Sequence, residues 1–284
     1  MDLITLLLAV LTAQASTPAG KMIDLDGRRL HLNCTGSGTP TVLIETGLGS
    51  FSTEWAAVQA RMQQFTRICS YDRGGYPPSD PGPFPRTFAQ LNLELHEALS
   101  RAGERAPLVL VAHSFGGGVV RAYTERYPND VAGLVLVDVV SEQQYVRMGP
   151  HAGRIADGAK GRAIPEPTLS GKGEGGLAEA ENNQREWSSE YFARWLSASQ
   201  SGTLGKRPLI VLARADGAYP DNLDKPAAEL ERARLAGQRA LATLSTQGSL
   251  RLLQAGHDLH VDATNDVVQA IQQVVKAVRA VARP

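Results

Sequence analysis

The stretch from Leu108 to Gly117 constrains the fold of this chain more than any other. Its sequence, LVLVAHSFGG, runs from an apolar segment through a turn of small residues toward a helix. A strand that reverses so sharply into a helix strains the backbone at the turn, which requires very small residues two positions before and after it. Ala112 and Gly116 hold these positions around Ser114. The segment therefore predicts a nucleophile elbow, G-x-S-x-G with Ala for the first Gly, that presents a hydroxyl at the start of a helix.

The apolar runs along the chain predict an alternation of strands and helices. The later strands are apolar at nearly every position, which indicates burial on both faces, whereas the first two carry charge and suit an antiparallel edge. The predicted strands are Met22–Leu25, Arg29–Cys34, Thr41–Glu45, Thr66–Tyr71, Leu108–Ala112, Gly133–Val139, Leu209–Ala213 and Leu250–Gln254. Apolar spacing near 3.6 predicts helices over Thr53–Phe65, Arg86–Ala102, Gly117–Tyr127, Ala227–Ser245 and Thr264–Val281. This alternation predicts a doubly wound, mostly parallel sheet of eight strands.

Two further residues complete a candidate catalytic set with Ser114. A serine hydroxyl needs a base within hydrogen-bond reach, and His257, which follows the last predicted strand, is the candidate; His260 is the competitor. The base needs an acid that fixes its tautomer. Asp138 and Asp216, which end the sixth and follow the seventh predicted strand, are alternatives for that role.

Several segments give the chain a resemblance to a known superfamily. They are NCTGSGTPTV at 33–42, CSYDRGGY at 69–76 and LVD at 136–138, together with the chain order Ser, Asp, His. From about residue 22 to 282 the chain resembles the α/β-hydrolase superfamily, and within it a group of bacterial serine hydrolases. The resemblance implies the α/β-hydrolase fold, with the stretch 141–205 between the sixth and seventh strands forming a lid over the active site.

The resemblance also implies roles for individual residues. Asp216 lies in ARADGAYP, which is similar to the superfamily pattern G-x-x-D-x-x-x-P, and this favours it as the acid. Asp138 stands where some haloalkane dehalogenases carry theirs, so both stay open. The backbone N–H groups of Phe115 and Leu48 are the expected oxyanion donors. The segment Asp72–Tyr76, which contains Arg73 and follows the fourth strand, is expected to brace the loop that carries Leu48 (the oxyanion loop) by an ion pair and a tight turn.

The predicted lid contains a helix over 178–199 with an aromatic stripe. Trp187, Tyr191 and Trp195 recur every fourth residue, on one face of that helix. The stripe either lines an acyl pocket or seats the helix on the body of the protein.

The predicted function is hydrolysis of small-molecule carboxylic esters through an acyl-enzyme, with no metal or organic cofactor. A lactonase, an amidase or aminopeptidase, and a non-catalytic binding protein of the same fold are the alternatives. The chain has 29 Lys and Arg against 29 Asp and Glu, so net charge does not indicate a nucleic-acid partner.

The N-terminus predicts export. Leu3–Leu11 is largely apolar and is followed by Ala13 and Ala15 at the spacing of a cleavage site, so residues 1–15 are expected to be a signal peptide and 16–284 the hydrolase domain. The apolar stretch is too short to span a bilayer. The alternative is an apolar N-terminus on a cytoplasmic protein.

The two cysteines also bear on whether the protein is exported. The superfamily's strand order makes the strands that carry Cys34 and Cys69 neighbours. A disulfide between them is expected if the protein is exported, and two buried thiols are expected otherwise.

Overall fold

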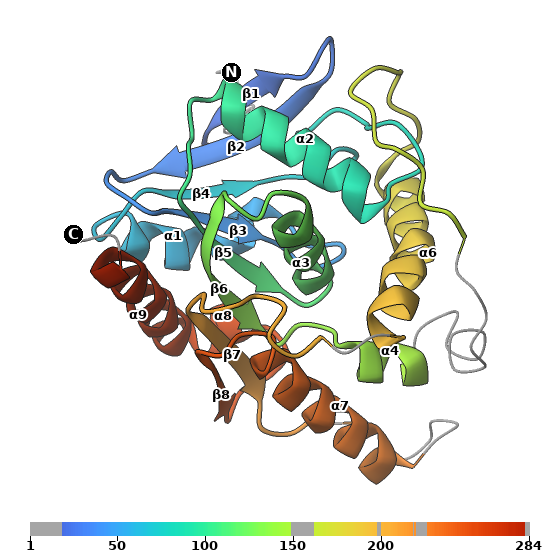
Figure 1. The fold of residues 1–284 in the computed structure, drawn as a ribbon. Coiled ribbons are helices and arrows are strands. Elements are labelled where there is room, and N and C mark those ends of the chain that lie inside the picture. The colour runs from blue at the N-terminus through green and yellow to red at the C-terminus, as the bar shows by residue number, and fades with distance from the viewer. Residues whose placement is uncertain (1–18, 149–161, 198–199, 218, 220–225, 282–284) are drawn as a thin grey trace, which may run out of the picture.

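The computed structural model describes residues 19–148, 162–197, 200–217, 219 and 226–281. The predicted signal peptide at 1–15 lies outside these residues. A single sheet of eight strands runs through the molecule in the order β1-β2-β4-β3-β5-β6-β7-β8 (Figure 1). The strands are β1 (Lys21–Asp24), β2 (Arg29–Thr35), β3 (Thr41–Glu45), β4 (Ile68–Tyr71), β5 (Leu108–His113), β6 (Val131–Val137), β7 (Leu209–Arg214) and β8 (Gly248–Leu253).

The sheet is mostly parallel, with an antiparallel edge. β2 pairs antiparallel with both β1 and β4, and the remaining strands pair parallel from β4 to β8. The predicted eight strands, their chain order and the antiparallel edge are therefore confirmed. The reversal of order around β3 and β4 requires crossover connections, and these carry the helices.

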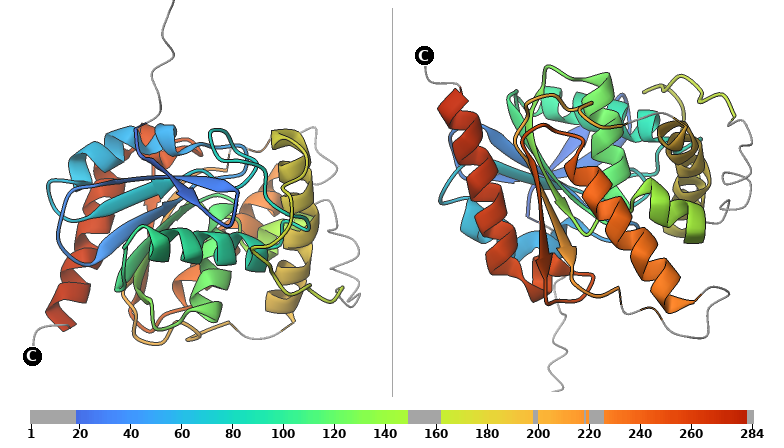
Figure 2. Two further views of the ribbon diagram at one scale, coloured as in Figure 1. Left: turned by 90° about the horizontal axis from the view of Figure 1, so that it is seen from above. Right: turned by 60° about the horizontal axis from the view of Figure 1, so that its bottom comes forward.

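Helices cover both faces of the sheet (Figure 2). On one face, Leu110 and Leu136 pack in a cluster that includes Leu95 of α2 (Phe88–Arg101) and Val120 of α3 (Gly116–Arg126). On the other face, the neighbouring residues Val109 and Val135 pack with residues of α1 (Ala56–Met62) and α9 (Thr264–Val281). Side chains alternate across a strand, so continuously apolar strands fill two cores at once.

The predicted helices are confirmed with shifted ends, and two short helices were not predicted. α7 (Ala227–Ala242) follows β7, and the predicted helix at 53–65 begins as the 3₁₀ turn η1 (Ser52–Trp55) and ends at Met62. α4 (Glu142–Met148) and α8 (Leu259–Asp262) are new. Both are too short for an apolar repeat to reveal them.

The long connection between β6 and β7 packs beside α2 and α3 (Figure 1). Its main element is α6 (Leu177–Leu196), close to the predicted 178–199. Tyr191 and Trp195 are buried against Phe88 of α2, with ring centroids 4.6 and 6.2 Å away, whereas Trp187 is half-buried beneath Arg162. Two of the three stripe residues therefore seat the helix on the body. Residues 149–161 of this connection lie outside the described residues.

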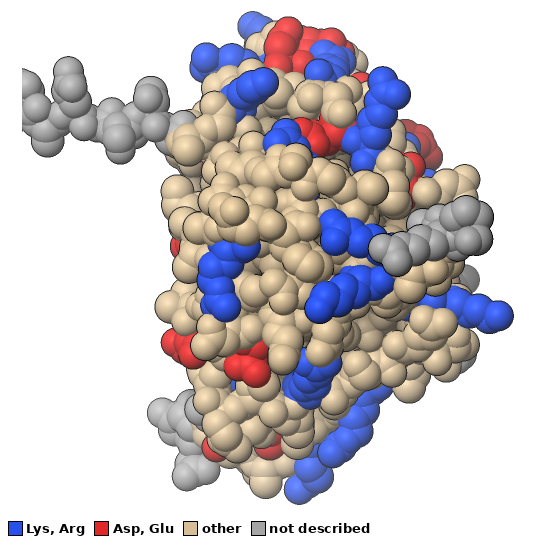
Figure 3. Space-filling view, turned by 90° about the vertical axis from the view of Figure 1, so that its left-hand side faces the viewer, with Lys and Arg blue, Asp and Glu red and all other residues tan. Residues whose placement is uncertain are grey.

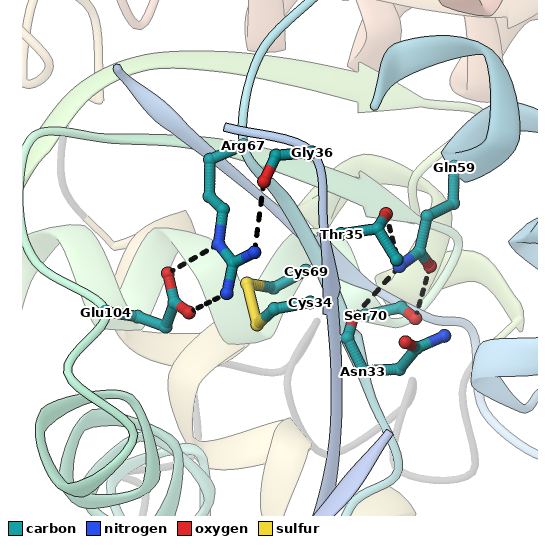
Figure 4. Close-up of a disulfide and its surroundings, with 9 residues drawn as sticks. All are labelled: Asn33, Cys34, Thr35, Gly36, Gln59, Arg67, Cys69, Ser70 and Glu104. Carbon is teal, nitrogen blue, oxygen red and sulfur yellow. Dashed lines mark hydrogen bonds and ion pairs between the residues drawn. A yellow bond between two sulfur atoms is a disulfide. The ribbon is translucent and has the colours of Figure 1, made fainter. Parts of the chain in front are cut away.

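A disulfide joins Cys34 to Cys69 (Figure 4). The two residues are direct partners across the antiparallel β2–β4 ladder, with Cα atoms 4.0 Å apart. Gln59 of α1 reinforces the same pair of strands by donating to the carbonyl of Asn33 and accepting from the hydroxyl of Ser70. The expected disulfide is thus present and fastens the edge of the sheet.

Charge is unevenly distributed over the surface although it sums to zero. On the face seen in Figure 3, Lys and Arg side chains are more prominent than Asp and Glu. None of the described helices is long and apolar enough to cross a membrane.

The disulfide predicts a stability difference. It closes a loop of 35 residues, so the double variant Cys34→Ala/Cys69→Ala is expected to unfold with a free energy about 3–4 kcal/mol lower than the parent, because its unfolded chain is less constrained. Urea unfolding followed by circular dichroism measures this. A reducing agent should destabilise the parent and leave the double variant unchanged; an equal response of both would contradict the prediction.

Candidate active site

Ser114 lies at a strained turn between β5 and α3. Its φ is +51°, in the left-handed region that a serine rarely adopts. Two backbone hydrogen bonds hold it there: Ser114 N–H donates to the carbonyl of Val137 at 3.2 Å, and the N–H of Val140 donates to the carbonyl of Ser114 at 3.1 Å. The predicted elbow is therefore present, and its backbone is fixed by the segment that leaves β6.

The small residues of the elbow make this geometry possible. A Cβ at Gly116 would lie 2.6 Å from the carbonyl oxygen of Thr46, and one at Gly117 would lie 2.4 Å from Cβ of Val139. Both distances are shorter than atoms can approach. The glycines therefore let the turn press against the loop after β3 on one side and the exit of β6 on the other.

His257 bridges Ser114 and Asp138. It lies in the loop after β8, with Nε2 3.0 Å from Ser114 Oγ and Nδ1 2.7 Å from Asp138 Oδ2. A carboxylate only accepts, so the pattern assigns the ring proton to Nδ1 and leaves Nε2 to accept from the serine hydroxyl. The imidazole is 40% exposed and the carboxylate only 4%. This is the arrangement in which a base can take a proton from a hydroxyl while a buried acid orients it.

Of the two candidate acids, the structure brings Asp138 and not Asp216 to hydrogen-bond distance of His257. Asp138 directly follows β6 with φ +42°, and its N–H donates to the carbonyl of Leu212 at 2.7 Å. Asp216 is exposed in the loop after β7. Sequence pattern placed both residues at the same sheet edge, and the contact with His257 distinguishes them.

The other histidines near the site have structural positions. His260, the competitor for the base, is buried and stacks on Trp55 with ring centroids 4.5 Å apart. His113 Nε2 lies 3.1 Å from the carbonyl oxygen of His257, so that nitrogen donates and holds the loop that carries the base. Burial lowers the pKa of His113 to about 3, and its neighbours His257 and His260 add to the effect. His113 is therefore uncharged at neutral pH and has a structural position.

Arg73 holds the loop after β3 in place. The buried guanidinium pairs with Glu45 at 2.7 Å and donates to the backbone carbonyls of Thr46 (3.1 Å) and Gly47. The expected brace by Arg73 is thus confirmed. It fixes the loop against the elbow, where a Cβ at Gly47 would lie 3.4 Å from Cβ of Ser114.

The two expected oxyanion donors flank this contact. Among the described residues, neither the N–H of Leu48 nor that of Phe115 has a hydrogen-bond partner. Leu48 follows Gly47 in the braced loop, and Phe115 follows Ser114. An N–H group at an active site that the fold leaves unused is available to an incoming oxyanion.

Two arginines beside Asp138 were missed by the sequence analysis. Arg214 donates its backbone N–H to Asp138 Oδ1 at 3.2 Å and places its Nε 3.3 Å from Oδ2. Arg234 of α7 places Nη1 3.7 Å from Oδ1. The position of Arg214 two residues before Asp216 offered a weak signal, whereas Arg234 approaches from a helix that no motif connects to the site.

Two groups of metal-ligating residue types lie close together in the described part of the chain. One is Cys34, Cys69 and Glu104, in which the cysteines are bonded to each other and so offer no thiolate. The other is His113, Asp258 and His260. His113 Nε2 donates to the carbonyl of His257, so that nitrogen is occupied in this second group.

The topology agrees with what comparison to known proteins finds. Residues 40–156 match the family model described as the alpha/beta hydrolase fold. The chain has the α/β-hydrolase fold. A solved structure of Est816, described as an N-acyl homoserine lactone degrading enzyme, superposes with a TM-score of 0.61 at 15% identity, over 89% of this chain and 99% of that one. A thermophilic esterase from Thermogutta terrifontis superposes with a TM-score of 0.57 at 22% identity, over 90% and 97%.

Relatives by sequence extend the likeness. The uncharacterized protein YqjL of Bacillus subtilis is 26% identical over 258 residues, which are 89% of this chain and 91% of that protein. The probable transporter efuK of Hormonema carpetanum is 33% identical over 135 residues, 45% of this chain. The chain spans only 19% of efuK, and it spans less than half of several other curated relatives.

The burial of His113 predicts a pH dependence of stability. Its pKa is about 3 in the folded protein against 6.5 ordinarily, so between these values the unfolded chain binds one proton more and stability falls as pH falls. The slope of unfolding free energy against pH, measured in urea at pH 6 to 4, is expected to be shallower in His113→Asn by up to ~1.4 kcal/mol per pH unit. Equal slopes in parent and variant would contradict this.

Proposed function

We propose that the protein is a serine hydrolase that cleaves small carboxylic esters through an acyl-enzyme. The observation that carries the proposal is the chain of two hydrogen bonds from Ser114 Oγ through His257 to Asp138. A hydroxyl, an imidazole and a buried carboxylate in this order form a complete nucleophilic site. In this assignment Asp138 is the triad acid.

The reaction runs in two halves. Ser114 Oγ attacks the ester carbonyl carbon while its proton passes to His257 Nε2, and Asp138 steadies the imidazolium that results. The backbone N–H groups of Leu48 and Phe115 bind the tetrahedral oxyanion. Collapse breaks the bond to the alcohol, which leaves with the proton from His257. Water then attacks the acyl-enzyme by the same route, which releases the carboxylic acid and restores the serine.

Esters are the favoured substrates because a triad with no further machinery handles good leaving groups most easily. The esterase among the structural neighbours supports this choice. Est816, described as a lactone degrading enzyme, makes lactones, which are cyclic esters, the second candidate class. An amide needs a leaving amine to be protonated, and nothing described at the site favours it specifically. A panel of p-nitrophenyl esters of increasing acyl length, a lactone and a peptide p-nitroanilide distinguishes the three classes.

The connection that carries α6 is proposed to act as the lid. Tyr76, whose hydroxyl lies 3.4 Å from the N–H of Gly49 in the oxyanion loop, also donates to Gln184 of α6 at 3.3 Å. The helix therefore reaches the oxyanion loop through one side chain. A Tyr76→Phe variant with unchanged preference along the ester panel would count against a lid in this position.

Export is proposed for the same protein. The Cys34–Cys69 disulfide supports it, because such bonds persist mainly in oxidising compartments. N-terminal sequencing of the protein recovered outside the cytoplasm tests it, and the proposal requires a chain that begins at Ser16. A chain recovered only from the cytoplasm with free thiols would refute it.

Substitutions test the proposed triad directly. Ser114→Ala, His257→Ala and Asp138→Asn are each expected to lower kcat/KM for p-nitrophenyl acetate by about 10³-fold or more, because each removes one member of a unit that acts together. Asp216→Asn is the matched control and is expected to change it by less than about threefold.

Active-site labelling separates an enzyme from a binding protein of the same fold. A fluorophosphonate should modify the parent at Ser114 and leave Ser114→Ala unmodified. A parent protein that is folded but unreactive, or a Ser114→Ala variant that keeps its esterase activity, would overturn the proposal.

A further inference from the structure

We propose that Arg214 and Arg234 are positioning residues that clamp Asp138 and set the pH range in which His257 serves as a base. The proposal rests on the triad assigned under the proposed function. In this triad the acid is Asp138, which follows β6. The loop after β7 does not supply the acid; the last residue of β7, Arg214, supplies a cation that lies beside it.

The clamp is visible in the surroundings of the Asp138 carboxylate. Oδ2 faces His257 Nδ1 at 2.7 Å and Arg214 Nε at 3.3 Å. Oδ1 accepts from the backbone N–H of Arg214 at 3.2 Å and faces Arg234 Nη1 at 3.7 Å. Both oxygens therefore lie against positive charge in addition to the imidazole. A carboxylate that orients an imidazole needs only the imidazole as its partner. The two guanidinium groups beside Asp138 therefore require an explanation.

The position of Arg234 is built by its own helix. Its side chain is 1% exposed, and Glu231, one turn earlier in α7, accepts from Nε at 2.9 Å and from Nη2 at 2.6 Å. The same carboxylate accepts from the backbone N–H of Gly217 at 2.9 Å. Glu231 thus ties the β7 loop to α7 and aims the free edge of Arg234 at Asp138.

Charge explains why the clamp would matter. With His257 neutral, the charges of Asp138, Arg214, Arg234 and Glu231 cancel. A buried carboxylate without such partners would be costly to keep ionised. When His257 accepts a proton, the cluster gains one positive charge, so the arginines oppose the imidazolium while they stabilise the carboxylate.

The other groups that face His257 do not offset this. His113 from β5 lies with its ring centroid 4.6 Å from that of His257, and His260 from α8 lies beside His113 at 4.8 Å; burial lowers the pKa of both. Asp258, the next residue in the chain, is 62% exposed and faces His113 at 3.7 Å. The arginines are therefore the buried cations that oppose protonation of the site, and they extend its activity toward acidic pH.

The test is the pH profile of kcat/KM for p-nitrophenyl acetate in Arg214→Met and Arg234→Met. On the acidic side of this profile, activity falls as His257 becomes protonated; we call this part the acid limb. Each substitution is expected to move the acid limb to higher pH by about one unit, because it removes one positive charge that opposes the imidazolium from a few ångströms away. A roughly tenfold fall on the plateau should accompany the shift, since Asp138 loses a contact that orients it. Arg214→Lys, which keeps the charge, should keep the limb near its parental position.

Two controls make the outcome specific. Arg251→Met removes an arginine of β8 whose described partner is Gln273, and it should leave the limb in place. Thermal unfolding identifies variants that lose their fold. If Arg234→Met does, Arg234→Gln replaces it, because glutamine also removes the charge but keeps an N–H donor for Glu231.

The result separates the clamp from the triad. Limbs that stay at the parental pH in folded Arg214→Met and in folded Arg234→Met or Arg234→Gln, while Asp138→Asn is inactive, would overturn the clamp and leave the triad standing. An active Asp138→Asn would overturn both. A shift in the methionine variants that the lysine variant largely reverses supports the clamp.

Discussion

The site depends on one constraint, the parallel register between β5 and β6. His113 is paired with Val137, so the next residue of each strand leaves the sheet at the same edge and the same level. These next residues are Ser114 and Asp138, and both adopt positive φ. The N–H of Ser114 donates to the carbonyl of Val137, so each turn supports the other. His257 needs only to enter between them from the loop after β8.

Buried charge holds the surrounding loops to this edge. Arg73 fastens the oxyanion loop through Glu45 and two backbone carbonyls. Arg86 pairs with Glu94 at 2.7 Å and also donates to the carbonyl of Gly74 at 3.1 Å, which holds the segment after β4. Such pairs add little net stability compared with apolar residues of the same size, but removing one partner would leave an uncompensated buried charge. They fix the positions of loops that have no regular structure.

Local patterns predicted most of the fold. Short apolar runs marked all eight strands, and the strands covered on both faces were apolar at nearly every position. Helical periodicity marked the long helices. Ser114 was predictable because the steric demand of the turn falls on its immediate neighbours, and His257 because chain order restricted the choice. The short helices α4 and α8 were not predictable, since one or two turns are too few to show an apolar repeat.

The sequence by itself determined which elements form, and that a serine and a histidine stand at the ends of strands. Only the tertiary structure decided that Asp138 and not Asp216 meets the imidazole, and that Arg214 and Arg234 surround that carboxylate. The physical reason is how far apart along the chain the interacting residues lie. Strands, helices and the elbow follow from neighbours within a few positions, whereas the partners of Asp138 come from residues 76 to 119 positions away. Their approach is set by backbone direction and helix packing, which no local pattern records.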